Sequence, residues 1–278
     1  KAVVLAVVSI FCYLLIQSVY REVRAREEIE ILAKDLAKAN ARLKELDQLK
    51  SQFLSFASHQ LRGPLTAVKG YASLILEGSF GKPSPGIEDA VHKMFEATQN
   101  LVVVVQDFLD VSRIEQGKMQ FECIKIDFKT LVEEIIGELK PNIDTAGLSL
   151  SFTQDRRGEY PILADKVKLR QVIGNLIDNA IKYTPKGSIA VRLEHKQEPG
   201  KILLSIKDTG IGIPKETLPR LFEKFSRDKD ANKTNVMGSG LGLYVAKEMI
   251  KGHGGTIWAE SAGPGKGSTF FVEVKEVS

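Results

Sequence analysis

Residues 21–57 constrain the fold of this chain more than any other stretch, because they contain neither Gly nor Pro. Apolar side chains recur there at alternating steps of three and four, in the order Ile29, Leu32, Leu36, Ala39, Leu43, Leu46, Phe53 and Ala57. Such a heptad stripe, interrupted at Lys50, predicts a long helix that pairs with a second helix. A lone amphipathic helix could show the same stripe, but the length favours a parallel dimeric coiled coil over residues 21–49.

An uncharged apolar run precedes this helix: the letters AVVLAVVSIFCYLLI, extended by QSVY, fill residues 2–20. About 20 mostly apolar residues span a bilayer, so this run predicts a transmembrane helix. Arg21, Arg24 and Arg26 follow at once, which places the C-terminal side in the cytoplasm by the positive-inside rule. A signal peptide or a buried core helix would also be apolar, but no small-residue cleavage site precedes the arginines.

The composition of the whole chain is that of an ordinary globular protein, with 43% hydrophobic and 27% charged residues. The formal net charge is only +4, and Lys and Glu alternate along the predicted helices. A nucleic-acid binder concentrates its basic residues on one face, so we expect no direct contact with nucleic acid. The two cysteines, Cys12 and Cys123, lie in different segments and form no disulfide framework.

A helical hairpin is predicted next. The helical pattern continues to about Glu77, breaks at Gly78–Gly86, where Gly and Pro cluster, and resumes from Ile87 to Glu115. The apolar face of the second helix consists of Leu101, Val104, Val105, Phe108, Leu109 and Val111. Two such hairpins bury their apolar stripes when they form a four-helix bundle. We therefore expect a dimeric helical-hairpin domain over residues 50–117.

Residues 121–278 show a mixed pattern. Strand-like runs occur at 148–153, 188–194, 202–208, 255–261 and 268–274. Helical stretches lie between them at 128–145, 166–183, 215–225 and 241–252. Strands in hairpins beside segregated helices favour an α+β sandwich over a doubly wound parallel sheet. The whole chain is thus expected to combine an all-α part with a C-terminal α/β sandwich.

Two Gly-rich segments in this sandwich suit the close approach of a ligand to the backbone. In Asp208–Pro214 (DTGIGIP), Gly210 and Gly212 carry no side chain, and Asp208 is a carboxylate suited to accept from an exocyclic amine. A tight turn at a polar strand end is the alternative. The second segment, Gly238–Leu243 (GSGLGL), opens a helix and leaves N–H groups free for phosphate. It is neither a Walker A motif nor a good dinucleotide fingerprint.

A third polar cluster lies on a predicted helix. Asn175, Asn179 and Lys182 are spaced at i, i+4 and i+7, which places them on one face. Asn is a poor helix former, and capping does not explain two of them one turn apart. An amide oxygen on Mg²⁺ and a lysine on phosphates would explain the pattern.

In chain order, NLIDNAIKYTP, DTGIGIP, LFEKFSR, GSGLGL and GSTF resemble the ATP-binding domain shared by histidine kinases, gyrases, heat-shock chaperone ATPases and mismatch-repair ATPases. The resemblance spans about residues 121–278 and implies ATP and Mg²⁺ as ligands. It places adenine on Asp208 and Thr269. Mg²⁺ falls on Asn179, with Asn175 nearby, and phosphates fall on Lys182 and the second Gly-rich segment. The other residues implied at the nucleotide, including two phenylalanines that would position a lid at 226–237, are Tyr183, Gly210, Gly212, Phe222, Phe225, Gly238, Gly240, Leu241 and Gly242.

Upstream, FLSFASHQLRGPL (residues 53–65) resembles the phosphoacceptor segment of bundle-type histidine kinases. A neutral imidazole nitrogen is a good nucleophile near pH 7, and an exposed helical His can reach a docked nucleotide. A lone surface His is usually without function, but ahead of this ATPase domain His59 is the predicted phosphoacceptor. Pro64 removes the N–H that would bond the Gln60 carbonyl and should weaken or bend the helix just past His59.

Two residues depart from the family's pattern. The residue after the acceptor is usually Glu or Asp and serves as its base, whereas Gln60 can fix the tautomer but cannot take a proton. The fourth residue after the acceptor is usually Thr or Asn and supports dephosphorylation of the partner, whereas Gly63 has no side chain. We expect slowed autophosphorylation and little or no phosphatase activity.

Together these features predict a sensor histidine kinase that moves the γ-phosphate of ATP to His59 and then to an aspartate of a separate response regulator receiver domain. The resemblance implies a homodimer at the inner (cytoplasmic) membrane, anchored by residues 2–20, with catalytic domains facing the cytoplasm. Two alternatives stay open. One is a non-kinase ATPase of the same fold, and the other is a membrane-anchored nucleotide-binding scaffold (pseudokinase) in which Gln60 and Gly63 mark lost activity.

Overall fold

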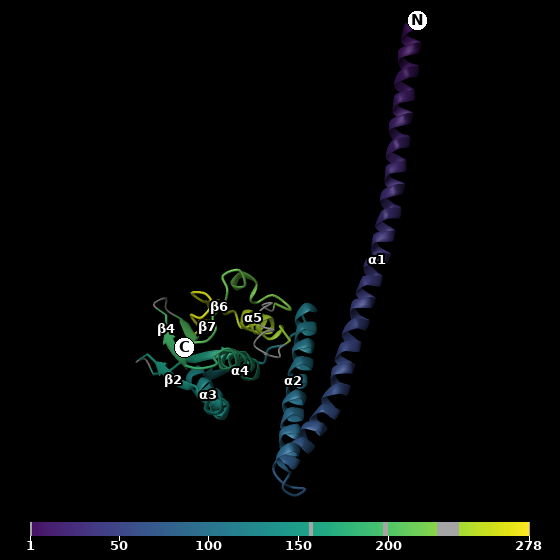
Figure 1. Ribbon diagram of the computed structural model, residues 1–278. Helices are drawn as coiled ribbons and strands as arrows, with labels where there is room; N and C mark the ends of the chain where they lie inside the picture. The colour runs from purple at the N-terminus through teal and green to yellow at the C-terminus, as the bar shows by residue number, and fades with distance from the viewer. Residues whose placement is uncertain (1, 156–157, 197–199, 227–238, 278) are drawn as a thin grey trace. The chain divides into compact units, whose positions relative to one another are not determined.

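The computed structural model describes residues 2–155, 158–196, 200–226 and 239–277 (Figure 1). Within the first helix, the side chains of residues 2–9, 12, 51, 53, 55, 58 and 59 lie outside the described part. The chain divides into two units, Lys1–Ala57 and Ser58–Ser278.

The first unit belongs to helix α1, which runs from Ala2 to Leu76. Its apolar stripe faces solvent, since Leu32, Leu36 and Leu43 are 64–68% exposed. Of the residues described, none forms a helix that is both long and apolar enough to cross a membrane. The side chains at 2–9 and at Cys12, in the predicted span, lie outside the described part. The coiled coil and the membrane helix therefore stay predictions.

The second unit begins with a helical hairpin made of the C-terminal part of α1 and of α2 (Pro85–Glu115). Helix α1 continues through Pro64, and the connecting turn uses positive φ angles at Gly78 and Gly81. Pro85 starts α2, where its missing N–H has no cost. Apolar side chains on both helices stay 40–48% exposed, namely Leu61, Val68, Leu74, Leu101 and Phe108.

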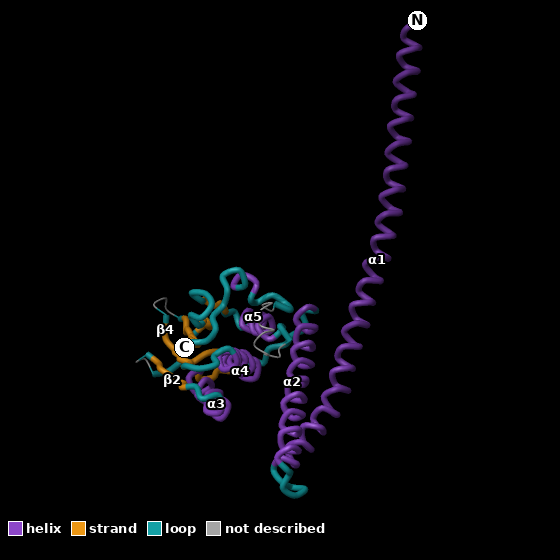
Figure 2. The backbone as a smooth tube through the Cα atoms, viewed as in Figure 1, coloured by secondary structure: helices purple, strands orange, loops and turns teal. Residues whose placement is uncertain are grey.

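A five-stranded sheet forms one layer of the C-terminal domain (Figure 2). Its order is β2 (Ser149–Gln154), β4 (Ser188–His195), β5 (Lys201–Asp208), β7 (Ser268–Lys275) and β6 (Thr256–Glu260). Only β2 and β4 are parallel, and the other neighbours are antiparallel. A separate antiparallel pair joins β1 (Ile124–Asp127) to β3 (Pro161–Ala164).

Helices α3 (Phe128–Thr145), α4 (Lys166–Lys182) and α5 (Gly242–Gly252) form the other layer. Alternate strand residues point into the layer between, and the fully buried ones on β4 and β5 are Ile189, Val191, Leu193, Ile202, Leu204 and Ile206. Val111 of α2 belongs to the same core. The predicted α/β sandwich is confirmed.

Two local predictions fail. The expected helix at 215–225 is wrong, because only the short 3-10 helix η1 (Leu218–Arg220) forms there. Pro214 and Pro219 each remove a backbone donor, so turns replace the α-helical ladder. Strands β1 and β3 were not predicted.

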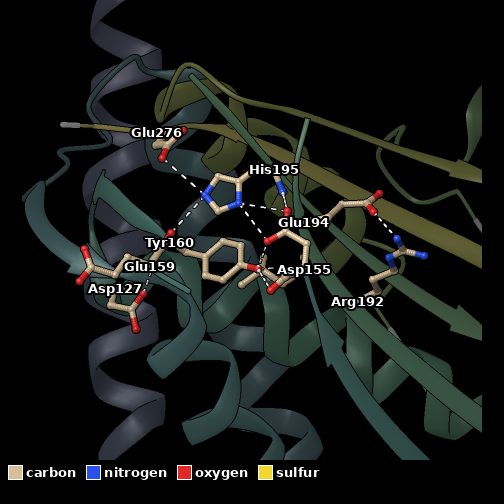
Figure 3. Close-up of polar contacts among 9 residues, drawn as sticks. Asp127, Asp155, Glu159, Tyr160, Arg192, Glu194, His195 and Glu276 are labelled. Carbon is tan, nitrogen blue, oxygen red and sulfur yellow. Dashed lines mark hydrogen bonds and ion pairs between the residues drawn. The ribbon is translucent and has the colours of Figure 1, made fainter. Parts of the chain in front are cut away.

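A buried polar cluster lies at the edge of the sheet where strand β4 ends at His195 (Figure 3). The His195 side chain is 3% exposed, and its Nδ1 lies 3.1 Å from both carboxylate oxygens of Asp155. The ring stacks on Tyr160, whose hydroxyl donates to the same carboxylate at 2.6 Å. Burial and the Asp155 carboxylate raise the pKa of Tyr160 beyond its ordinary range. Glu276, 3.5 Å from Nε2, ties the last strand to this cluster.

The segment between α2 and β1 is anchored by Phe121. Its ring fills the space beside Gly252, where a Cβ would stand only 2.1 Å from the ring. The His253 ring packs against it edge-on, with centroids 5.0 Å apart. Glu122 N–H donates to Asp165, which also caps α4. Residues 116–120 are thus the whole connection from α2 to the anchored Phe121, and Gly117 and Lys118 are hydrogen-bonded back to α2.

Candidate nucleotide and phosphoacceptor site

Asp208 ends strand β5 and is 3% exposed. Its Oδ1 accepts from the N–H groups of Gly210 (2.8 Å) and Ser268 (3.2 Å), and its Oδ2 accepts from the Ser268 hydroxyl. A carboxylate offers about four acceptor positions, so these three donors leave room for one more. The carboxylate is held rigidly and can still accept from an amine.

The hydroxyl beside Asp208 belongs to Ser268 and not to the predicted Thr269. Successive strand residues point to opposite faces, and β7 directs the buried Ser268 toward the helices. Thr269 is half-buried and pairs with Lys207 and Glu260. The hydroxyl that contacts Asp208 is therefore that of Ser268, one residue before Thr269, and the adenine contact of Thr269 stays a prediction.

The glycines predicted beside Asp208 are required by close backbone packing. A Cβ on Gly210 would stand 2.1 Å from the carbonyl oxygen of Tyr183. A Cβ on Gly212, whose φ is +71°, would stand 2.2 Å from the carbonyl oxygen of Gly263. The loop after β5 therefore lies directly on the end of α4, and both positions exclude any side chain.

Thr184 supplies a buried polar atom that sequence reasoning missed. It is 2% exposed, and its hydroxyl has no hydrogen-bond partner among the residues that the structure describes. The hydroxyl oxygen and Asp208 Oδ1 both lie 2.8 Å from the point where a Cβ on Gly210 would stand. Buried hydroxyls are normally satisfied, so this one fits a polar ligand or a water beside Asp208.

The predicted Mg²⁺ and phosphate residues lie together on α4. Asn179 Nδ2 approaches Asn175 Oδ1 at 3.4 Å, and Asn175 packs where a Cβ on Gly242 would stand at 2.8 Å. Helix α5 thus begins against the asparagine pair. Lys182 forms an ion pair with Asp178 at 2.5 Å, so it must exchange this partner to reach a phosphate.

The remaining predicted residues surround this centre. Tyr183 caps the C-terminus of α4, Leu241 is 2% exposed at the start of α5, and Gly240 has φ +69°. Phe222 packs against the core, whereas Phe225 is 65% exposed with a strained φ of +57°. Gly238 and almost all of the predicted lid, 227–237, lie outside the described residues.

The phosphoacceptor segment lies on α1, where Gln60 is exposed. The His59 side chain is outside the described part. Gly63 meets nothing within 4 Å of its ideal Cβ position, so space does not require glycine there. Arg62, one turn beyond His59, donates to Gln106 of α2 at 2.6 Å and so fixes the two helices beside each other.

Residues 164–278 match the family of histidine kinase-, DNA gyrase B- and HSP90-like ATPases, and residues 49–117 match the His Kinase A (phospho-acceptor) domain. By these two domains the chain belongs to the sensor histidine kinases. The signal transduction histidine-protein kinase BarA of Escherichia coli K12 is 33% identical over 257 residues, which cover 91% of this chain and 27% of BarA. WalK of Bacillus subtilis is 32% identical over 238 residues, covering 84% of this chain and 38% of WalK.

Solved structures are similar over most of the chain. Full-length ShkA in complex with AMPPNP has a TM-score of 0.65 at 25% identity and covers 82% of this chain and 46% of ShkA. The histidine kinase AdeS of Acinetobacter baumannii has a TM-score of 0.54 at 27% identity and covers 79% of this chain and 98% of that structure. The chain spans between 27 and 38% of the length of the two named kinases, BarA and WalK.

Proposed function

We propose that this chain is the catalytic core of a sensor histidine kinase that phosphorylates its own His59 with ATP. The observation that carries the proposal is the geometry of Asp208, a buried carboxylate with one acceptor position left. Adenine presents an exocyclic amine that fits this position. Thr184 and Ser268 supply hydroxyls beside it, and the tight glycines bring backbone close to the ligand.

The polar end of the site suits the triphosphate. Asn179, with Asn175 nearby, would hold Mg²⁺, which neutralises phosphate charge when it is bound. Lys182 and the N–H groups at the start of α5 would bind the phosphate oxygens. A neutral nitrogen of His59 attacks the γ-phosphorus, the bond from phosphorus to the β–γ bridging oxygen breaks, and ADP leaves.

Gln60 sets the expected rate. Because an amide cannot accept the imidazole proton, that proton passes to solvent without a positioned base. Positioning and charge stabilisation carry most phosphoryl-transfer catalysis, so we expect slow turnover. The missing side chain at Gly63 should leave little phosphatase activity.

The chain would also dimerise, attach to the membrane and pass its phosphoryl group to a partner. The exposed apolar faces of α1 and α2 fit a homodimer in which two hairpins form a four-helix bundle. Residues 2–20 would anchor the chain in the inner membrane, with the catalytic domains in the cytoplasm. A receiver-domain aspartate of a separate response regulator would take the phosphoryl group.

The test is incubation of the purified chain with γ-labelled ATP and Mg²⁺, beside His59→Gln. Label that is acid-labile, base-stable and lost in His59→Gln is the expected result, and Gln60→Glu should raise its rate. ATP hydrolysis without protein label would favour the plain ATPase. ATP binding with neither label nor hydrolysis would favour the scaffold, the alternative that the presence of Gln60 in place of a base suggests.

A further inference from the structure

One side of α2 carries three carboxylates that contact the nucleotide-binding domain. The pairs are Asp107 with Ser239 (2.8 Å), Asp110 with Gln171 (3.0 Å) and Glu115 with Lys224 (2.5 Å). Lys224 and Ser239 flank the predicted lid, so both of its ends are held by the same helix. We call these three carboxylates the α2 clamp.

The pair of Asp107 and Ser239 involves the second Gly-rich segment directly. The Ser239 hydroxyl donates to Asp107, and the same oxygen accepts from Leu241 N–H at 3.2 Å. Leu241 N–H is one of the donors predicted to bind phosphate. In the clamped arrangement it is already bonded to Ser239, and Ser239 is bonded to a carboxylate.

The carboxylate of Asp107 lies beside this segment, and its negative charge should repel a phosphate. Asp107 is 7% exposed, and burial raises its pKa, although the Ser239 hydrogen bond lowers it in part. Asp107 and Asp178 both line a cavity of about 320 Å³ that also includes Asn175 and Gly242. Of the predicted nucleotide residues, Asn175 and Gly242 line this cavity, whereas Asn179 and Lys182 do not, and α2 forms one of its walls. A nucleotide phosphate entering it would meet the Asp107 carboxylate in a largely dehydrated place.

We propose that, where α2 packs on the nucleotide-binding domain, Asp107 competes with the nucleotide's phosphates for the Gly-rich segment. The carboxylate takes the place of an anionic ligand while the domain is docked. Binding of ATP releases Ser239 and frees Leu241 N–H. The inference rests on the proposed function, because it assumes that this segment binds phosphate.

The first test compares ATP dissociation constants, by titration calorimetry, for the unaltered chain, Asp107→Asn and the matched control Asp89→Asn. Asn keeps an acceptor for Ser239 but removes the charge, and Asp89 is an exposed carboxylate on the same helix. We expect ATP to bind about tenfold tighter to Asp107→Asn, since a hydrogen bond to a charged group is at stake. Asp89→Asn should bind like the unaltered chain. Equal affinity in all three would overturn the proposal.

The second test reports on docking itself. With Cys12 and Cys123 replaced by Ser, the pair Glu115→Cys and Lys224→Cys leaves Asp107 and Ser239 in place and should form a cross-link readily with a short thiol-to-thiol reagent while the domain is docked. Saturating ATP should slow its formation at least about fivefold, as competition requires. Formation at the same rate with and without ATP would also overturn the proposal.

The tests distinguish a failure of the proposed function from a failure of the Asp107 competition alone. If the proposed function is wrong and the chain does not bind nucleotide, no variant will bind ATP, although the cross-link still forms. If only the competition is wrong, ATP binds the unaltered chain and Asp107→Asn equally well.

Discussion

The two folded parts of the second unit bury their apolar residues to very different degrees. In the α/β domain, Leu176 and Ile173 of α4 are 0% exposed. On the hairpin, Leu101 of α2 is 46% and Leu74 of α1 is 40% exposed. Both regions have amphipathic helices, but only α4 has a sheet to cover its apolar face. The α/β domain therefore completes its core within one chain, whereas the hairpin presents a face that a second copy can cover.

Truncation in the closed core should have the largest effect. Leu176→Ala should lower the free energy of unfolding by about 2–5 kcal/mol, because it leaves a cavity that the surrounding layers cannot fill. Urea unfolding followed by circular dichroism measures this. The same truncation at Leu74 is the control, and we expect it to cost less than about 1 kcal/mol when the chain is dilute and monomeric. Equal losses would remove the contrast between the regions.

A charge on the open face should act on assembly. Leu101→Glu should weaken self-association by about 100-fold, or ~2.7 kcal/mol, because dimerisation would bury an unpaired carboxylate. Sedimentation equilibrium measures the constant, and Leu101→Ala is the uncharged control with a smaller expected effect. Unchanged association of Leu101→Glu would show that this face is not the one that pairs.

The contribution of Asp165, at the junction between the two regions, to the stability of the fold should depend on pH. Burial alone would raise the pKa of Asp165, but hydrogen bonds from Lys168 and Glu122 lower it from 3.8 to about 2. A lowered pKa stabilises the folded state above pH 3.8, and this contribution is lost as the pH falls toward 2.

Asp165→Asn should therefore cost about 2 kcal/mol at pH 7 and about half of that at pH 3. Urea unfolding of both proteins at the two pH values gives the difference. A cost that does not change with pH would mean that the carboxylate's charge is unimportant there.

The smallest effect is expected at Thr184. Thr184→Val replaces the unpartnered hydroxyl by a methyl group of the same shape, and should raise the stability of the nucleotide-free chain by about 1 kcal/mol. Differential scanning calorimetry measures it, with Thr184→Ser as the hydroxyl-retaining control. A loss of stability would instead show that a water satisfies the hydroxyl in the free protein.

Periodicity predicted the long elements well. Helix α3 matches its predicted range, α4 differs by one residue, and β4 and β5 are each longer by one residue at one end. These segments carry their pattern within themselves. Strands β1 and β3 have four residues each and are stabilised by pairing with one another, although α3 and β2 separate them in the sequence, so local pattern could not reveal them.

The site could be predicted as a set of motifs but not as a set of contacts. The spacing of Asn175 and Asn179 on one helix follows from sequence, as does the need for glycine at 210. That Ser268 rather than Thr269 reaches Asp208 depends on strand register. The bond between Ser239 and Asp107 joins residues 132 positions apart, which no local pattern encodes.

The Phe121 anchor has a consequence for the reach of the nucleotide-binding domain. Helix α2 ends at Glu115, so residues 116–120 form the whole connection to Phe121, which spans at most about 18 Å even when fully extended. A domain on so short a tether meets its docking surface at an effective concentration in the millimolar range. The α2 clamp then adds to the packing of Val111 in the shared core, and the domain stays close to α2. A connection of five residues thus raises the ATP concentration that would be needed to free Ser239 from Asp107.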